Sequence, residues 1–343
     1  MKPIVLQGHS RPIRDIKFNQ LGDLLFTGSV DRLLSLWTTQ TGERIGTFTH
    51  SAAVSNFCVT KDSRFLISGD TTGTIYIWDV YAGKKIREFE GDPSLSVRNI
   101  DLSYGDEKVS FVISGRSKTS KSYVETYKLF DLLTVSDTES LKKSMESVIQ
   151  SSESKFTLSK FSDINKKMYV SREDGCLDVY DSNEKKLIMS KKFHDDVILD
   201  FDISPRQEVL ITASRDGKSN IIDSGSFEVI NTFFPSKPTR NLNACKISPF
   251  FYLKDEDLNN NKKFHAIIAG GQESKDVTTT HTNAGGFEVM FYNIMYKDEI
   301  GSVSGHFGPI NSLAFSGDGK YFASGGEDST IRLYNLTEEL INK

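Results

Sequence analysis

Short apolar runs bounded by turn residues recur along the chain. Four of them occupy residues 24–26, 65–67, 209–211 and 321–323. Continuous apolarity over so few residues is typical of a strand that is covered on both faces. A turn rich in Asp and Gly follows, as at Asp216-Gly217, and then an alternating strand such as residues 74–78. This pattern predicts antiparallel hairpins, and no comparable helical period runs through these units.

Seven segments end in an aromatic or apolar residue that is followed by a polar one. They are Trp37-Thr38, Trp78-Asp79, Phe130-Asp131, Tyr180-Asp181, Ile222-Asp223, Tyr292-Asn293 and Tyr334-Asn335. The successive gaps between their first residues are 41, 52, 50, 42, 70 and 42 residues. One four-stranded propeller blade takes about 40–45 residues. The chain is therefore predicted to contain seven such units, three of them lengthened by insertions.

The units share an internal spacing. Four histidines are each followed 18 residues later by a hydroxyl residue. In three of these units an Asp comes four residues further on and an aromatic or apolar residue six beyond it, whereas the second unit has Thr72 in the Asp position. This spacing resembles the WD40 repeat.

We interpret these residues as a structural network within each blade. A histidine near the edge of a blade can bond the hydroxyl and the carboxylate in a half-buried site, which satisfies the polar groups while the rings pack. The members of the predicted network are His9, Thr27, Asp31, Trp37, His50, Ser68, Trp78, His194, Thr212, Asp216, His306, Ser324, Asp328 and Tyr334.

The predicted fold class is all-β, a seven-bladed WD40 β-propeller. The last unit supplies three strands and the chain stops eight residues after Asn335, whereas residues 4–6 form an apolar strand directly before Gly8-His9. We expect this N-terminal strand to complete the C-terminal blade and so to remove an exposed sheet edge. Residues 1–343 are expected to form a single domain with a short C-terminal tail at 336–343.

Three stretches break the period. Residues 116–123 lengthen a turn of the third unit, and residues 131–155 form a polar connector to the fourth. In the connector the repeat favours an extended outer strand, and one face of a helix is the alternative for Leu141, Met145, Val148 and Ile149. The third stretch belongs to the sixth unit, with a polar loop at 255–263 and an excursion at 271–286.

Charge and composition narrow the choice of partners. The 42 Lys and Arg residues against 46 Asp and Glu residues give a net charge of −4. Such a balance offers no broad electrostatic footprint for phosphate backbones or anionic lipid. We expect no membrane partner and no direct RNA contact, and we interpret Lys118 and Lys121 in the third-unit insertion as solvated.

The location is predicted from apolar runs and cysteines. No run approaches the roughly 18 apolar residues that cross a bilayer, and the apolar stretch in residues 1–7 is too short for a signal peptide. Cys58, Cys176 and Cys245 lie far apart in apolar contexts, which indicates reduced core thiols in a reducing compartment. We expect a cytoplasmic protein.

A search for enzymatic motifs yields one candidate. Residues 194–202 hold His194 and four aspartates, which could form a metal cluster. However, Asp200 and Asp202 alternate with apolar residues, as on the polar face of an innermost strand, and alternation does not make ligands converge. Gly270-Gly271 and Gly285-Gly286 are interpreted as turns or bulges, and His265 and His281 as surface or loop residues. We therefore predict no catalytic residue, cofactor or metal, and an enzyme that uses a central channel is the least favoured hypothesis.

Several segments resemble the i subunit of eukaryotic translation initiation factor three. They are residues 22–26, 42–47, 270–280, 305–311 and 323–328. Residues 92–192 retain only the periodicity. The resemblance implies a non-catalytic scaffold subunit that holds a C-terminal helix of the b subunit against blades five and six and also engages the g subunit. Such a complex helps the small ribosomal subunit to assemble with mRNA and initiator tRNA, so contact with the ribosome is expected to be indirect.

The resemblance also implies a partner-binding site around residues 204–206 and Ile222-Asp223. Asp223 is the candidate partner for an Arg on the incoming helix, because a positioned carboxylate can accept a bidentate pair; a turn cap is its alternative role. Arg206 lies where an acidic side chain would suit that Arg better, and Ile222 replaces the usual aromatic. The alternative function is a WD40 adaptor in signalling or substrate recruitment, which would not need residues 272–280.

Overall fold

The computed structural model describes residues 2–115, 117, 121–151, 153–162, 164, 166–234, 241–249, 251, 266–271 and 286–336. In this part of the chain, antiparallel strands form seven four-stranded sheets, named blades one to seven in chain order. The prediction of an all-β, seven-bladed β-propeller is confirmed. The chain divides into two compact units. That residues 1–343 form a single domain stays a prediction.

The first compact unit comprises Met1–Phe26, Trp37–Arg44 and Ile198–Lys343. It contains three blades. Blade five is β18 (Ile198–Ile203), β19 (Val209–Ser214), β20 (Ser219–Asp223) and β21 (Val229–Phe233). Blade six is β22 (Asn241–Ile247), β23 (Ala266–Gly271), β24 (Glu288–Asn293) and β25 (Asp298–Ser304). Blade seven is β26 (Ile310–Phe315), β27 (Tyr321–Gly326), β28 (Ile331–Asn335) and the N-terminal β1 (Ile4–Leu6).

The second compact unit comprises Thr27–Leu36 and Ile45–Val197. It also contains three blades. Blade two is β6 (Val54–Val59), β7 (Phe65–Asp70), β8 (Ile75–Asp79) and β9 (Lys84–Phe89). Blade three is β10 (Leu95–Leu102), β11 (Lys108–Gly115), β12 (Ser122–Lys128) and β13 (Ser147–Gln150). Blade four is β14 (Phe156–Ser162), β15 (Lys167–Arg172), β16 (Cys176–Asp181) and β17 (Leu187–Lys192).

Blade one is divided between the two units. Its strands are β2 (Ile13–Phe18), β3 (Leu24–Ser29), β4 (Leu33–Thr38) and β5 (Arg44–Thr49). The division falls inside β3, β4 and β5.

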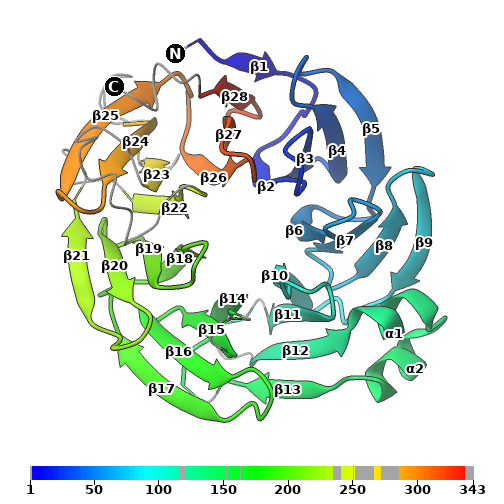
Figure 1. Cartoon of the computed structure of the whole chain (residues 1–343). Coiled ribbons are helices and arrows are strands. Elements are labelled where there is room, and N and C mark those ends of the chain that lie inside the picture. Colours follow the sequence, from blue (N-terminus) through cyan, green and yellow to red (C-terminus); the bar gives the residue numbers. More distant parts are fainter. Residues whose placement is uncertain are drawn as a thin grey trace. The chain divides into compact units, whose positions relative to one another are not determined.

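The N-terminal strand completes blade seven, as the sequence predicts. β1 lies beside β28 (Figure 1) and pairs with it antiparallel, with Ile4 opposite Leu333 and Leu6 opposite Ile331. Leu6 is only 2% exposed and packs in the same core cluster as Ile331 and Leu333. The backbone edge of β28 is therefore covered by a strand from the other end of the sequence.

The burial of each strand follows its place in the blade. All six residues of β19 are buried, whereas five of the six residues in the outermost strand β17 are exposed. The second strand of a blade is covered on both faces, and this explains its continuous apolar run.

Gly175, in the turn before β16, has φ +83° and approaches the carbonyl oxygen of His194 so closely that a Cβ would lie 2.1 Å from it.

The predicted repeat ending of blade three is wrong. Phe130-Asp131 does not end a strand; it lies in the helix α1 (Leu129–Thr134), and Phe130 is 71% exposed. β12 ends instead at Tyr127-Lys128, with Tyr127 opposite Val109 in the register that Trp78 and Leu66 have in blade two. The inserted helix contains a second pair of an aromatic and a polar residue, Phe130-Asp131, three residues after Tyr127-Lys128. The repeat spacing alone could not show which of the two pairs ends the strand.

The connector of blade three contains both predicted structures. The outer strand is confirmed for Val148 and Ile149, which lie in β13. Leu141 instead lies in the helix α2 (Thr138–Lys143), where it is 3% exposed. Asp137 starts this helix because its carboxylate accepts a hydrogen bond from the backbone N–H of Ser140 at 2.8 Å. In the sequence, the apolar residues of this short helix and of the strand that follows it form one continuous pattern. The pattern therefore could not show where the helix ends and the strand begins.

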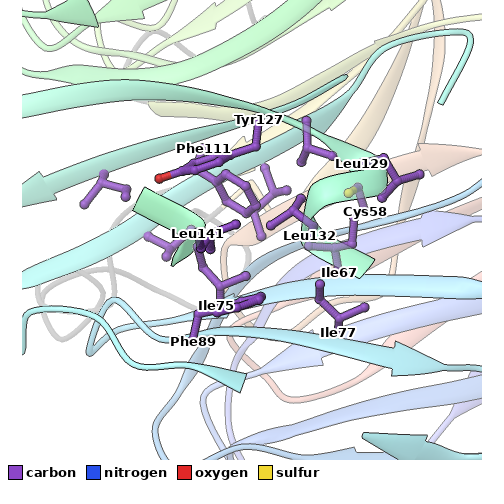
Figure 2. Close-up of a cluster of buried hydrophobic side chains, with 14 residues drawn as sticks. Cys58, Ile67, Ile75, Ile77, Phe89, Phe111, Tyr127, Leu129, Leu132 and Leu141 are labelled. Carbon is purple, nitrogen blue, oxygen red and sulfur yellow. The ribbon is translucent and has the colours of Figure 1, made fainter. Parts of the chain in front are cut away.

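The two helices pack into a core cluster shared by blades two and three. Figure 2 shows Leu129, Leu132 and Leu141 from the helices beside Phe111 and Tyr127 of blade three. Phe89 from the outer strand of blade two belongs to the same cluster. Arg87 of β9 also donates a hydrogen bond to the carbonyl of Val135, between the helices, at 3.0 Å. The insertion thus joins the outer parts of two neighbouring blades.

Several predictions lie outside the described residues. They concern Lys118, the polar loop at 255–263, His265, His281, Gly285, residues 272–285 of the sixth-unit excursion, and the tail beyond residue 336.

Candidate partner-binding surface

Asp223, the favoured partner-binding residue, caps the turn between β20 and β21. Its Oδ1 accepts hydrogen bonds from the backbone N–H groups of Gly225 at 3.0 Å and Ser226 at 2.6 Å. The hydroxyl of Ser226 donates to the same oxygen at 2.9 Å. The backbone carbonyl of Asp223 accepts from the N–H of Phe227 at 3.0 Å. The carboxylate is therefore held in one orientation at the edge of blade five.

The same capping contact recurs in other blades. Asp79 accepts from the N–H of Ala82, Asp181 accepts from those of Asn183 and Glu184, and Asn293 accepts from those of Met295 and Tyr296. The polar residue after the aromatic is thus explained by the turn that it caps. Any partner contact of Asp223 comes in addition to this role.

Arg206 lies in the turn between β18 and β19, and its side chain is exposed. Ser204 shapes this turn by accepting hydrogen bonds from the N–H groups of Glu208 and Val209. Ser224 joins the two turns, because its hydroxyl donates to the carbonyl of Gln207 at 2.6 Å. The structure thus brings the turns that carry Arg206 and Asp223 to the same edge of blade five.

Ile222 is the third predicted member of the site, and it is fully buried. It is 0% exposed and lies opposite Leu210 in the sheet. In this structure its side chain therefore faces the core, and it contributes to the surface only by positioning the backbone of Asp223.

Sequence reasoning missed the apolar surface next to this edge. On β21, Val229 is 44% and Ile230 43% exposed, and Phe234 directly after it is 62% exposed. Blade six presents Tyr296 and Ile300, which are 47% and 43% exposed. The consecutive residues Val229 and Ile230 could have indicated this surface. An outermost strand is covered on one face only, so two apolar residues in a row cannot both be buried there.

In blade two, the predicted network residues meet around Ser68. His50 Nε2 lies 2.7 Å from Ser68 Oγ, and Trp78 Nε1 donates to the same oxygen at 2.9 Å. His50 Nδ1 lies 3.2 Å from the carbonyl of Phe48, which can only accept, so Nδ1 carries the proton of the neutral ring. Burial lowers the pKa of His50 to about 4. The ring is therefore neutral near pH 7.

Blade two takes its carboxylate from a position that the spacing did not indicate. Asp70, two residues before Thr72, is 0% exposed. It accepts hydrogen bonds from the Tyr76 hydroxyl at 3.2 Å and from the Thr72 backbone N–H at 2.8 Å. The carboxylate of blade two thus lies two residues before the position that the repeat spacing indicates. The Tyr76 hydroxyl connects it to the aromatic rings of the blade.

In blade seven, His306 lies between the hydroxyl and the carboxylate. Its Nε2 is 2.9 Å from Ser324 Oγ and its Nδ1 is 3.0 Å from Asp328 Oδ2. Burial alone would raise the pKa of Asp328, but hydrogen bonding and charge from His306 outweigh it and hold that pKa far below its usual range. Tyr334 stacks on Phe322 with ring centroids 4.5 Å apart.

The remaining network residues are found in blades one and five. The rings of His9 and Trp37 lie 6.3 Å apart, Thr27 is 0% exposed, and Asp31 accepts a hydrogen bond from the N–H of Leu33 at 3.0 Å. His194 is 3% exposed. In blade five, Thr212 Oγ1 donates to the carbonyl of Asn220, and Asp216 accepts from the N–H of Lys218 at 2.9 Å.

The aspartates of β18 bind the neighbouring innermost strand. Asp200 Oδ2 accepts hydrogen bonds from the N–H of Cys245 at 3.1 Å and from Lys246 Nζ at 2.6 Å. Asp202 Oδ2 accepts from the N–H of Ile247 at 3.0 Å. These contacts join blade five to blade six. The described residues include no group of three or more His, Cys, Asp or Glu side chains that could hold a metal ion.

Within the described ranges, no helix is both long enough and apolar enough to cross a membrane. Cys58 and Cys245 are buried, and Cys176 is half-buried.

Comparisons with known proteins cover nearly the whole chain. The family model described as EIF3I matches residues 1–342. "Eukaryotic translation initiation factor 3 subunit I" from Schizosaccharomyces pombe is 34% identical over 337 residues, which are 97% of this chain and 96% of that protein. The protein of the same name from Xenopus tropicalis is 35% identical over 335 residues and the human one 32% over 337, each with the same coverage.

Proposed function

We propose that this chain, which belongs to the family of eukaryotic translation initiation factor 3 subunit I, is the scaffold on which other subunits of that factor assemble. As a family member it is a non-catalytic subunit of a translation initiation factor. The single observation that carries the proposal is the match of the family model to residues 1–342. Propeller surfaces are suited to holding peptides and helices.

The finer proposal is that blades five and six hold a C-terminal helix of the b subunit. Support comes from the edge of blade five, where the oriented carboxylate of Asp223 lies near the exposed strand residues Val229 and Ile230. A carboxylate has roughly four acceptor sites on two oxygens, so a capping carboxylate can also receive an Arg guanidinium. An apolar surround strengthens such a pair by excluding water.

Arg206 affects the charge of the proposed site. Its exposed guanidinium carries the same charge as the proposed Arg of the helix, on the turn that Ser224 joins to that of Asp223. Like charges at short range repel each other. Arg206→Asp is therefore expected to tighten binding of the b-subunit helix, and an affinity that falls would contradict this arrangement.

We further propose that the chain engages the g subunit, works in the cytoplasm and contacts the small ribosomal subunit indirectly, through its complex. The net charge of −4 supports a protein partner rather than RNA. Through that complex it would support the recruitment of mRNA and initiator tRNA.

Affinity purification of the tagged chain from its native cell, followed by mass spectrometry, tests the scaffold proposal. Recovery of the b and g subunits in amounts comparable to the bait is the expected result. Recovery of a kinase or ubiquitin-ligase set without initiation-factor subunits would instead favour the WD40 adaptor.

A further inference from the structure

The link between α1 and α2, residues 135–137, carries an exposed hydroxyl group. Ser136 lies outside both helices, and its side chain is exposed. Among the described residues, its Oγ has one hydrogen-bond contact, with Asp137 Oδ2 at 3.4 Å. That distance is longer than the roughly 2.5–3.0 Å that is usual for an O–H···O bond. The hydroxyl of Ser136 is therefore accessible and only weakly held.

The two neighbouring hydroxyl groups are held in the helices. Thr134 is the last residue of α1, and its Oγ1 donates a hydrogen bond to the carbonyl of Phe130 at 2.9 Å. Thr138 is the first residue of α2 and is half-buried. A protein kinase must place the substrate hydroxyl against its own catalytic base. Of the three hydroxyl groups, that of Ser136 meets this requirement with the least change in structure.

The sequence around Ser136 is acidic. Asp137 follows it directly, Glu139 comes three residues after it, and both side chains are exposed. The nearest basic residues along the chain are Lys128, eight residues before, and Lys142, six residues after. Protein kinases select their substrates in part by complementary charge. This pattern therefore fits a kinase whose substrate groove is basic.

A guanidinium group contacts the backbone beside Ser136. Arg87 Nε donates to the carbonyl of Val135 at 3.0 Å, and Arg87 Nη1 donates to the carbonyl of Ile86 at 3.0 Å. Both acceptors are uncharged, and Arg87 forms no ion pair within the described ranges. A guanidinium has five N–H donors. Those of Nη2 thus stay available for a charged acceptor next to Val135.

We propose that Ser136 is phosphorylated by an acid-directed protein kinase and that Arg87 binds the phosphate. Ser136 Oγ attacks the γ-phosphorus of ATP, so that the Oγ–P bond forms and the bond from this phosphorus to the β,γ-bridging oxygen breaks. ADP leaves, and the hydroxyl proton passes to the catalytic base of the kinase. Arg binds phosphate oxygens through charge-assisted hydrogen bonds. The modification would fasten the insertion of blade three to β9 of blade two.

The first test incubates the full chain with ATP and purified casein kinase II, which selects an acidic residue three positions after the hydroxyl. Peptide mapping by mass spectrometry is expected to find the phosphate on Ser136, and Ser136→Ala should abolish it. Glu139→Gln should slow the reaction by about tenfold, because it removes a charged contact to the kinase. The matched control is Glu184→Gln, at an exposed acid on blade four, and it should react at the wild-type rate.

Two outcomes would overturn the proposed site. One is a phosphate that maps only to other residues of the folded chain. The other is a rate that Glu139→Gln and Glu184→Gln lower equally, since the acid at the third position would then have no directing role.

The second test compares thermal unfolding of the phosphorylated and unphosphorylated forms of the wild type and of Arg87→Gln. Phosphorylation should shift the unfolding midpoint to a value at least about 2 °C more favourable in the wild type than in Arg87→Gln. Repulsion from Asp137 and Glu139 is present in both proteins and cancels in this comparison. Lys84→Gln, at an exposed residue of the same strand, should show the wild-type shift. Equal shifts in the wild type and Arg87→Gln would contradict binding of the phosphate by Arg87.

Binding of the b-subunit helix separates this proposal from the proposed scaffold function. Ser136 belongs to the insertion of blade three and Asp223 to blade five, so Ser136→Ala should bind the helix with wild-type affinity. Failure of the kinase test leaves the scaffold proposal standing, and loss of helix binding in Asp223 variants leaves the phosphorylation proposal standing.

Discussion

At the scale of single residues, two amino acid types serve the same purpose in equivalent positions. The polar residue that ends the third strand caps a turn in blades two, four, five and six, whether it is Asp or Asn. Turn capping therefore needs an acceptor oxygen and not a negative charge. A substitution that keeps the acceptor oxygen but removes the charge can therefore separate the capping role of Asp223 from its proposed role as the partner of an Arg.

Asp223→Asn is predicted to weaken binding of the b-subunit helix without changing the midpoint of thermal unfolding. Asn keeps the capping oxygen, as Asn293 does in blade six, but loses the charge that would pair with an Arg. Isothermal titration with the helix should show a loss of about tenfold, in line with ~1.5–3 kcal/mol for a hydrogen bond to a charged group. Asp181→Asn, which changes the same position in blade four, serves as the control. An affinity unchanged by Asp223→Asn would remove the residue from the site.

His50 should make the stability of the protein dependent on pH. Its pKa is about 4 in the folded protein against 6.5 as the reference value. Between these values the unfolded chain binds a proton that the folded protein does not, so stability falls as pH drops below 6.5 and is fully present above it. The loss should reach about 2 kcal/mol at pH 5, from ~1.4 kcal/mol per pKa unit.

Urea unfolding at pH 7.5 and pH 5.0 measures this effect. His50→Gln removes the titrating ring, so the variant should be less stable at pH 7.5 but should lose about 2 kcal/mol less than the wild type on acidification. Equal losses in both proteins would show that His50 is protonated in the folded state.

At the scale of elements, blade three departs from the repeat because a pair of short helices replaces a turn. Six residues are too few for a stable isolated helix, so α1 and α2 depend on the core cluster in which Leu132 and Leu141 are buried. The strands of blade three were predicted from the local pattern of apolar and polar residues. α1 was not predicted, and the helix at Leu141 was only an alternative to a strand, because both helices depend on packing against Phe89 and Phe111, which are distant in sequence.

Leu132→Ala is predicted to destabilise the protein by about 2–5 kcal/mol, because it empties a fully buried position. Phe130→Ala, two residues earlier in the same helix but 71% exposed, should change the free energy of unfolding by less than about 0.5 kcal/mol. Denaturant unfolding of the two variants provides the comparison. Similar losses for both would contradict the observed packing of α1.

At the scale of the whole molecule, the two compact units are not separate stretches of sequence. The division between them passes through β3, β4 and β5, so strands of blade one contain residues of both units. Neither unit can unfold completely while these strands stay intact.

The prediction of a single domain can be tested on this basis. Differential scanning calorimetry of the full chain should show one transition, with calorimetric and van't Hoff enthalpies that agree. Two resolved transitions would show instead that the compact units are independent domains.

The sequence by itself determined the repeat, the fold class and the pairing of the N-terminal strand with the last blade. These follow from local spacing, because each blade must hide the same apolar faces and end in the same turns. Within the candidate site, the sequence grouped Asp223 with Arg206 through its resemblance to a known family, but it could not show that Ile222 is buried or that Val229 and Ile230 are exposed. It also placed the ending of blade three at Phe130 instead of Tyr127.

Only the tertiary structure decided these points, for a physical reason. Whether an apolar side chain is buried depends on what covers it, and the covering residues come from other strands and other blades. The sequence favours the polar face of an innermost strand for Asp200 over a metal cluster, but it could not show that this carboxylate bonds the backbone of Cys245, 45 residues away. Phe130 looks like a core residue, yet it is 71% exposed because Tyr127 already fills the core position.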